Sequence, residues 1–138
     1  MLTKILTTQK ERDELSQQLK AAATFVTMDD EDLAFLQEGA PVTEWQVEVA
    51  PSSQKSRMKV LLQEWKTVAD DLSNVKKIVL LLQFSQEHSL LMSEMQVVQE
   101  MFQSLPDTVS VQWGAGIEDT LGEKVRLTAV VQNFNIIS

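Results

Sequence analysis

Apolar residues recur at helical spacing in three long stretches of the chain. The first stretch follows Thr8 and Glu11, which have the spacing of a helix-capping box. Its apolar positions lie three or four residues apart, as in a helix that buries one face. They are Leu15, Leu19, Ala22 and Val26. The pattern predicts an amphipathic helix over residues 9–25.

The other two helical stretches lie in the middle of the chain and towards its end. One carries the apolar stripe Met58, Leu61, Leu62, Trp65, Val68 and Ala69. The other covers residues 93–105, where Pro106 and Asp107 would end the helix. Its stripe is Met95, Val98, Met101, Phe102 and Leu105. Such stripes are typical of helices that lie on a sheet, so we predict a packed core on one side of each.

Residues 29–32 are four consecutive acids, which could suggest a divalent cation site because hard cations prefer several converging carboxylates. Acids in a first helical turn also offset the positive end of the helix dipole. Leu33 and Leu36 follow at helical spacing, and Gly39 and Pro41 are typical of a helix end. We therefore predict a short helix here and no metal site.

Four stretches have strand patterns. Trp45, Val47 and Val49 alternate with polar residues, and residues 77–84 form an unbroken apolar run that is typical of a strand covered on both faces. Strict alternation returns in two final stretches, Val109 to Ile117 and Val125 to Val131. A polar turn separates them, which predicts a closing hairpin.

The order of these elements predicts an α/β (α+β) fold in one domain, residues 1–138. Two strand-helix-strand units favour parallel pairing, followed by an antiparallel edge. We expect a four-stranded mixed sheet with two long helices packed on it, plus the N-terminal helix within residues 1–25.

Charge and composition exclude several classes of binding partner. Twenty acidic residues against twelve basic ones give a formal charge of -8, which disfavours nucleic acid as a partner. The local basic candidates are Lys55, Arg57, Lys59, Lys76 and Lys77. No apolar run is long enough for a membrane span, and the N-terminus has no apolar core of signal-peptide length. The chain also has no cysteine. We expect a cytoplasmic protein that binds neither membranes nor nucleic acid.

Candidate chemistry is sparse. His88 is the single histidine, and because the chain has no second histidine and no cysteine, the sequence offers it no specific nucleophile or metal partner. We expect a solvated loop residue there, no catalytic residues, no metal and no cofactor. The protein is then a binding domain and not an enzyme.

The final stretch resembles a known family. The segment WGAGIEDTLGEKVRLTAVVQNF, from Trp113 to Phe134, resembles the end of the C-terminal domain of FtsZ, the bacterial tubulin homologue. The matching residues are Gly114, Ile117, Leu121, Gly122, Arg126 and Thr128, and the close substitutes are Glu118, Glu123, Val125 and Leu127. Weaker likeness extends the FtsZ C-terminal-like region over residues 25–135. Ala50 and Pro51 stand where the family has a glycine-rich turn, and Gln132 and Asn133 where it has Thr-Gly.

The resemblance implies a tubulin/FtsZ C-terminal-like fold without the GTPase half. None of the glycines, at 39, 114, 116 and 122, builds a phosphate-binding loop, so we expect no GTP binding. The family assembles head to tail. The resemblance therefore implies a protein partner, either an FtsZ-type GTPase of a division filament or a second copy. Two alternatives stay open: a small-molecule or enzymatic site between subunits, and a fragment of a longer chain.

Alternation in the last two strands also suggests where a partner would dock. If the larger apolar residues face the helices, the reverse face carries small and weakly polar ones. The candidate interface is Ser110, Gln112, Arg126, Thr128 and Gln132, beside Gly114, Gly116 and Val130. Such a face suits a packed layer, which is either the helix over residues 9–25 or another protein. The acidic loops around Glu87 and residues 118–123 are the second candidate.

Overall fold

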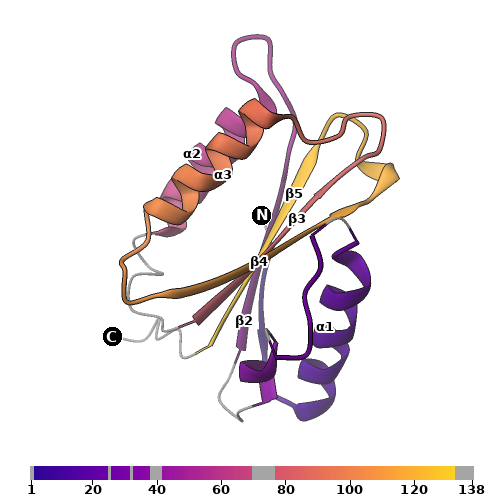
Figure 1. Ribbon diagram of the computed structural model, residues 1–138, viewed down its shortest axis with the longest axis vertical. Coiled ribbons are helices and arrows are strands. Elements are labelled where there is room, and N and C mark those ends of the chain that lie inside the picture. Colours follow the sequence, from indigo (N-terminus) through magenta and orange to yellow (C-terminus); the bar gives the residue numbers. More distant parts are fainter. Residues whose placement is uncertain (1, 25, 32, 38–41, 70–76, 133–138) are drawn as a thin grey trace.

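The chain folds into three layers, with a sheet between two helices on one face and one helix on the other (Figure 1). The computed structural model describes residues 2–24, 26–31, 33–37, 42–69 and 77–132. The predicted helix end at Gly39 and Pro41, and Phe134 of the family-like segment, lie outside these residues.

The sheet has five strands in the order β1-β2-β5-β3-β4. Their bounds are β1 Leu2–Leu6, β2 Val42–Val49, β3 Lys77–Phe84, β4 Ser110–Ile117 and β5 Val125–Gln132. β3 and β4 pair in parallel, and the other neighbouring pairs are antiparallel. The mixed α/β sheet is confirmed.

The predicted hairpin between β4 and β5 is wrong. β5 lies between β2 and β3, and β4 lies at the sheet edge beyond β3. Burial supplies the reason: Leu127 faces one layer of helices while Thr128 and Val130 are buried on the other face, so β5 needs a central place. For the same reason β2 and β3 run parallel without being neighbours, because β5 is inserted between them.

A fifth strand, β1, was not predicted. It covers the sequence LTKIL and pairs with β2 from Leu2↔Gln46 to Leu6↔Val42. Five residues with a single charge give too short a pattern to distinguish a strand from a lead-in to the helix. β1 forms the edge opposite β4.

The three long helices are confirmed within a few residues. They are α1 Gln9–Ala22, α2 Arg57–Ala69 and α3 Met92–Gln103. Thr8 caps α1 as predicted, because its hydroxyl accepts from the Glu11 amide at 3.1 Å and its own amide donates to the Glu11 carboxylate at 3.2 Å. None of the helices in the described part of the chain is long and apolar enough to cross a bilayer.

The acidic segment differs from its predicted helix. Asp29 lies in irregular structure and Asp30 and Glu31 in a turn, and a short 3-10 helix, η1 Ala34–Gln37, follows them. Asp30 forms an ion pair with Lys20 of α1. The acids therefore face solvent and a lysine instead of capping a helix.

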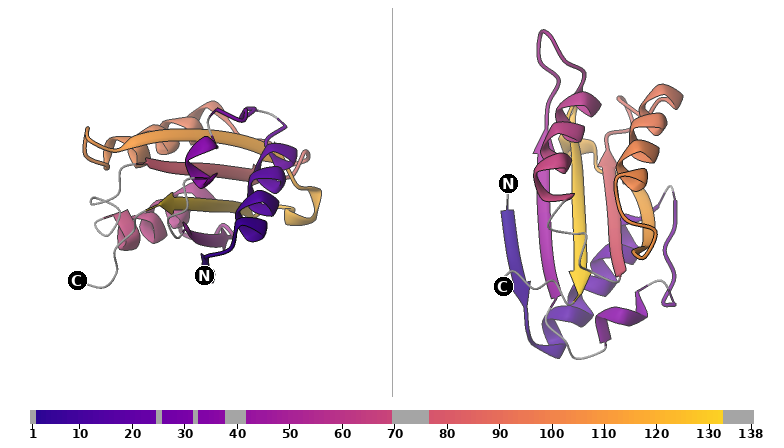
Figure 2. Two further views of the ribbon diagram at one scale, coloured as in Figure 1. Left: turned by 90° about the horizontal axis from the view of Figure 1, so that it is seen from below. Right: turned by 90° about the vertical axis from the view of Figure 1, so that its left-hand side faces the viewer.

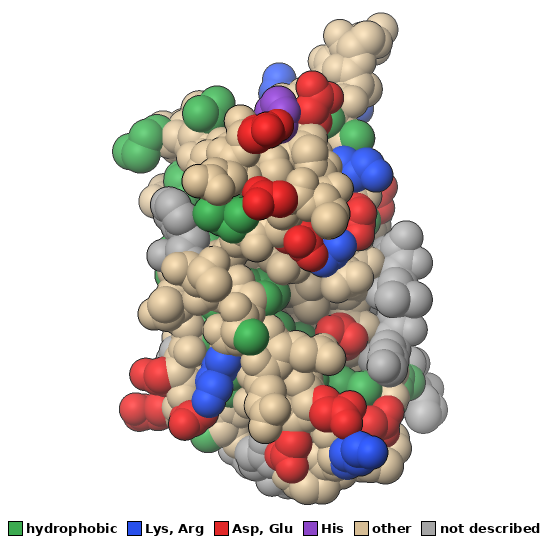
Figure 3. Space-filling view, turned by 90° about the vertical axis from the view of Figure 1, so that its right-hand side faces the viewer, with side chains coloured by type: hydrophobic (Ala, Val, Ile, Leu, Met, Phe, Trp, Pro, Cys, Tyr) green, Lys and Arg blue, Asp and Glu red, His purple; other side chains and the backbone are tan. Residues whose placement is uncertain are grey.

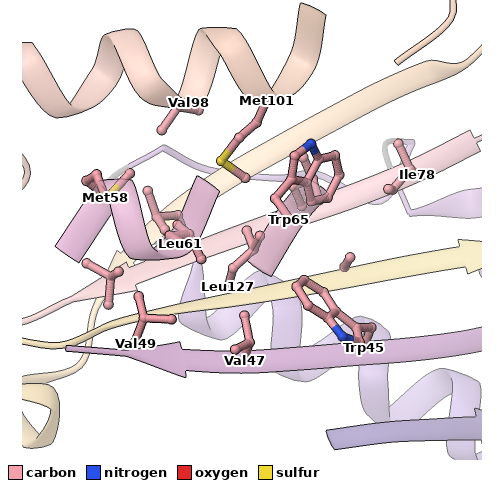
Figure 4. Close-up of a cluster of buried hydrophobic side chains, with 14 of the residues drawn as sticks. Trp45, Val47, Val49, Met58, Leu61, Trp65, Ile78, Val98, Met101 and Leu127 are labelled. Atoms are coloured by element: carbon pink, nitrogen blue, oxygen red, sulfur yellow. The ribbon is translucent and has the colours of Figure 1, made fainter. Parts of the chain in front are cut away.

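The larger core lies between the sheet and the helices α2 and α3 (Figure 4). Trp65 of α2 is fully buried, and its indole N–H donates to the Ser104 hydroxyl at 2.8 Å. Trp113 of β4 is only partly buried, because β4 is an edge strand. The predicted orientation holds: Val109, Val111, Trp113, Val125, Leu127 and Val131 all contact this core.

A second core lies on the reverse face of the sheet, under α1. Leu15 and Leu19 of α1 belong to one buried cluster with Val79 and Leu81 of β3 and Val130 of β5. Leu33 and Leu36, around η1, close the same cluster. Figure 2 shows α1 and η1 together on this side of the sheet.

Candidate protein-interaction surface

The predicted interface residues occupy different environments on the reverse face. Ser110 and Gln112 are exposed on β4, whereas Thr128 is only 2% exposed. Arg126 is partly exposed, and the side chain of Gln132 lies outside the described set. α1 covers one end of this face, which is the packed layer that the sequence left as an alternative to a partner.

Close approach of α1 explains the glycines of β4. A Cβ atom on Gly116 would lie 1.6 Å from the Ala22 carbonyl oxygen, and one on Gly114 would lie 2.9 Å from Met28. Only glycine lets the end of α1 and the following segment lie this near the sheet. This part of the face is therefore internal.

A polar row remains where α1 does not pack. Arg126 of β5 donates to the Glu48 carboxylate of β2 at 3.0 Å and to the Gln83 side-chain oxygen of β3 at 3.5 Å. Two residues further along β5, the side-chain amide of Gln46 donates to the Thr128 hydroxyl at 3.2 Å. Arg126 is therefore already paired within the sheet.

The carboxyl end of β3 carries a more elaborate polar arrangement, which is centred on Arg57. Arg57, the first residue of α2, is 8% exposed and donates to both carboxylate oxygens of Glu94, at 2.8 and 2.9 Å. It also donates to the backbone oxygen of His88 at 2.8 Å. One arginine thus joins the start of α2, the loop after β3 and the start of α3.

Glu94 is held in its charged form by this arrangement. Burial raises the pKa of Glu94, but hydrogen bonds from Arg57 and from the Leu91 amide, together with the Arg57 charge, outweigh burial and leave that pKa below its ordinary value. The bond from the Leu91 amide, at 2.9 Å, also caps α3. The ion pair therefore has a structural role in both helices.

Two loops lie against each other at the same end of the sheet. The Ser85 hydroxyl donates to the Gly122 carbonyl at 2.8 Å and accepts from the His88 amide at 3.1 Å. The backbone N–H of Gln86 donates to the Asp119 carboxylate at 3.0 Å. Gly122 has a φ of 59°, which favours glycine at this turn. These bonds hold the two loops against each other.

Open depressions lie over these loops. One, of about 340 Å³, is lined by Ser85, Gln86, Glu87 and Asp119. The other, of about 430 Å³, is bordered by Arg57, Glu87, His88, Leu91 and Glu123 among others. We call Glu87, Glu118, Asp119 and Glu123 the acidic end.

The acidic end carries its charge outwards. Glu87, Asp119 and Glu123 are exposed, and Figure 3 shows acidic side chains gathered around the histidine at this end of the molecule. Beside them Leu91 and Met92 are 62% and 85% exposed. A surface of anionic groups next to exposed apolar ones suits a basic protein surface with apolar spots.

His88 is exposed in the loop, as predicted, and it is the backbone of this residue that contacts Arg57. Within the described ranges no three His, Asp or Glu side chains come together in a way that could hold a metal ion. The carboxylates of the acidic end therefore do not converge on one point.

Sequence reasoning missed the role of Arg57. The sequence placed this residue only among the local basic candidates, with Lys55 and Lys59, whereas the structure buries it. One signal was present: Glu94 is three residues after Leu91, at the position of a capping glutamate. The bond to Arg57 joins residues 37 positions apart, which local patterns do not reveal.

Comparison with known proteins supports the fold. No family model matches the chain, and no curated protein does. Among solved structures, FtsZ of M. jannaschii in an empty dimer matches with a TM-score of 0.58 and 18% identity, over 79% of this chain and 32% of that one.

TubZ of Bacillus thuringiensis serovar israelensis is similar as well. Its GDP-form protofilament matches with a TM-score of 0.59 and 15% identity, over 83% of this chain and 31% of that one. A helical model of the TubZ-Bt four-stranded filament matches with a TM-score of 0.61 and 13% identity, over 93% and 35%. The chain thus spans about a third of the length of these proteins. At such identities the likeness shows the fold alone, which is an α/β fold like that of the FtsZ C-terminal domain.

Proposed function

We propose that this chain is a cytoplasmic, non-enzymatic protein-binding domain that docks through its acidic end on a basic surface of an FtsZ- or TubZ-type filament subunit. The observation that carries the proposal is the acidic end itself, where exposed carboxylates surround open depressions on loops that are already ordered. Preordered loops lose little entropy on binding, which favours protein recognition.

The fold supports the choice of partner. The similar proteins are described as an FtsZ dimer, as TubZ protofilaments and as a TubZ filament, so this fold occurs in subunits that associate with one another. A chain with this fold has the shape to contact such a subunit. The division filament is therefore the first partner to test.

Charge favours a basic protein surface over a small anionic ligand in the larger depression. Arg57 is the cation there, and its charge is already paired with Glu94. An anionic ligand would meet Glu87 and Glu123 at the border. A lysine- or arginine-rich surface meets favourable charge at the same place.

Co-sedimentation with an FtsZ-type GTPase polymerised by GTP tests the proposal. We expect the chain to pellet with filaments, and less so as salt rises, because the attraction is electrostatic. The double variant Glu87→Gln with Glu123→Gln should lose most of this binding. Its matched control is Glu14→Gln with Glu100→Gln, two exposed acids away from the acidic end, which should bind like the wild type.

Two results would contradict the proposal. One is the absence of the wild-type chain from the pellet at low salt. The other is equal binding by both double variants, which would place the contact elsewhere. Unaltered thermal unfolding of each variant confirms that only the surface charge has changed.

A further inference from the structure

β4 forms an edge of the sheet (Figure 2), and the Val26 bridge covers only part of that edge. The backbone N–H and C=O of Ala115 point away from β3, because they bond to Val26 at 3.0 and 2.9 Å. Successive residues of a strand point these groups to alternate sides, so those of Val111 and Trp113 also point outwards. In the part of the chain that the structure describes, nothing bonds to these four outward groups.

The part of the edge that Val26 does not cover carries neither a charge nor a proline to prevent pairing. β4 reads SVQWGAGI, without a charged residue or a proline, whereas the opposite edge strand β1 contains Lys4. Natural edge strands commonly use lysine, proline or bulges to avoid pairing with another chain. The uncharged first half of β4 is therefore ready to accept a partner strand.

The surroundings of the open segment leave room for one. Ser110 and Gln112 are exposed on the α1 side of the sheet. On the other side Trp113 is half-buried against Phe102 of α3, with ring centroids 5.8 Å apart. Val26 already forms an antiparallel bridge on the same edge, so this edge can pair with an antiparallel segment.

We propose that β4 pairs with β4 of a second copy, antiparallel, about a twofold axis at Gln112. Val111 then lies opposite Trp113 of the second copy, and Trp113 opposite its Val111. Each of these two pairs exchanges two backbone hydrogen bonds, which uses all the open outward groups. Pairing ends at Ala115, where Val26 occupies the edge.

The pairing is self-complementary, which is why a second copy is the occupant. The outward residues Val111 and Trp113 are spaced evenly on either side of Gln112, so one twofold axis satisfies both strands. Valine faces tryptophan on the α3 side, an aromatic and β-branched pair that stabilises antiparallel strands. Gln112 faces Gln112 of the second copy on the other side.

Salt dependence separates this contact from the one in the proposed function. Each copy carries a formal charge of -8, so two copies repel each other at long range. Added salt screens this repulsion and should strengthen the β4 pairing. Docking of the acidic end on a basic surface should weaken in the same salt, so either contact can fail without the other.

Sedimentation equilibrium of the full chain over a range of concentrations tests the pairing. We expect a monomer–dimer equilibrium that moves towards the dimer as salt rises. Gln112→Lys should give a monomer, because it places two lysines opposite each other at a distance of roughly 5 Å between Cβ atoms. The matched control is Gln63→Lys on the exposed face of α2, which should dimerise like the wild type.

Mixing two variants distinguishes lost pairing from a damaged fold. Gln112→Glu alone should also be monomeric, whereas a mixture of Gln112→Lys and Gln112→Glu should form a heterodimer through opposite charges. In the wild type, hydrogen exchange at the amides of Val111 and Trp113 should slow as concentration rises. A wild type that stays monomeric in high salt, or a Gln112→Lys variant that dimerises normally, would overturn the proposal.

Discussion

Arg57 and Glu94 join the first residue of α2 to the first turn of α3 through two hydrogen bonds, of 2.8 and 2.9 Å, with both side chains shielded from most of the solvent. The same arginine holds the His88 carbonyl, so the loop at the acidic end depends on it. A buried pair of this kind is sensitive to the loss of one member, because the other is then left charged without compensation.

Arg57→Ala should therefore lower the free energy of unfolding by about 3–5 kcal/mol. Lys59→Ala, two residues away and exposed, should change it by no more than about 0.5 kcal/mol. Urea denaturation followed by circular dichroism measures both. Equal effects in the two variants would mean that the ion pair adds little to stability.

Acid should weaken the fold through Glu94. Its pKa is lower in the folded chain than its ordinary value, so the unfolded chain takes up this proton at a higher pH. The Glu94 contribution is thus complete above the ordinary carboxyl pKa and is lost as pH falls through the lower folded value.

Wild type and Glu94→Gln should therefore converge in stability as pH falls through this window, and differ most near neutral pH. Urea unfolding at a series of pH values gives the comparison. Glu100→Gln, exposed on the same helix, serves as the control and should keep the wild-type slope. A constant difference between wild type and Glu94→Gln at all pH values would contradict the assignment.

A charge at Thr128 should disrupt the core. The side chain is 2% exposed and accepts a bond from Gln46, so Thr128→Glu buries a carboxylate at a cost of about 3–5 kcal/mol. Ser110→Glu places the same charge on the same face at an exposed position and should be nearly neutral. Melting temperatures of the two variants decide whether this face is internal.

Gly116 and Gly122 should respond to alanine for different reasons. At Gly116 the new Cβ must displace the Ala22 carbonyl, at a cost of about 1–3 kcal/mol. At Gly122 nothing lies within 4 Å, and only the backbone conformation, with a φ of 59° and a ψ of -122°, opposes alanine, at about 1–3 kcal/mol. Hydrogen exchange should be faster at the end of α1 in Gly116→Ala alone. Unaltered exchange there would show that α1 is not held by this contact.

The sequence by itself determined the local structure and the sheet faces. Alternation in β4 and β5 correctly assigned Trp113 and Leu127 to the α2 and α3 side, and the Thr8 capping box located the start of α1. These features depend on contacts between residues close in the chain, or on which side of a strand a residue lies, and periodicity records both.

Only the tertiary structure decided which strands are neighbours and which polar groups meet. Nothing in the alternation of β5 distinguishes pairing with β4 from insertion between β2 and β3, because alternation records only the face on which each residue lies. The bond between Arg57 and Glu94, and the open edge at Val111, likewise depend on segments that are distant in sequence. Such pairings depend on the packing of the whole chain, since the strand order must bury apolar side chains on both faces of the sheet.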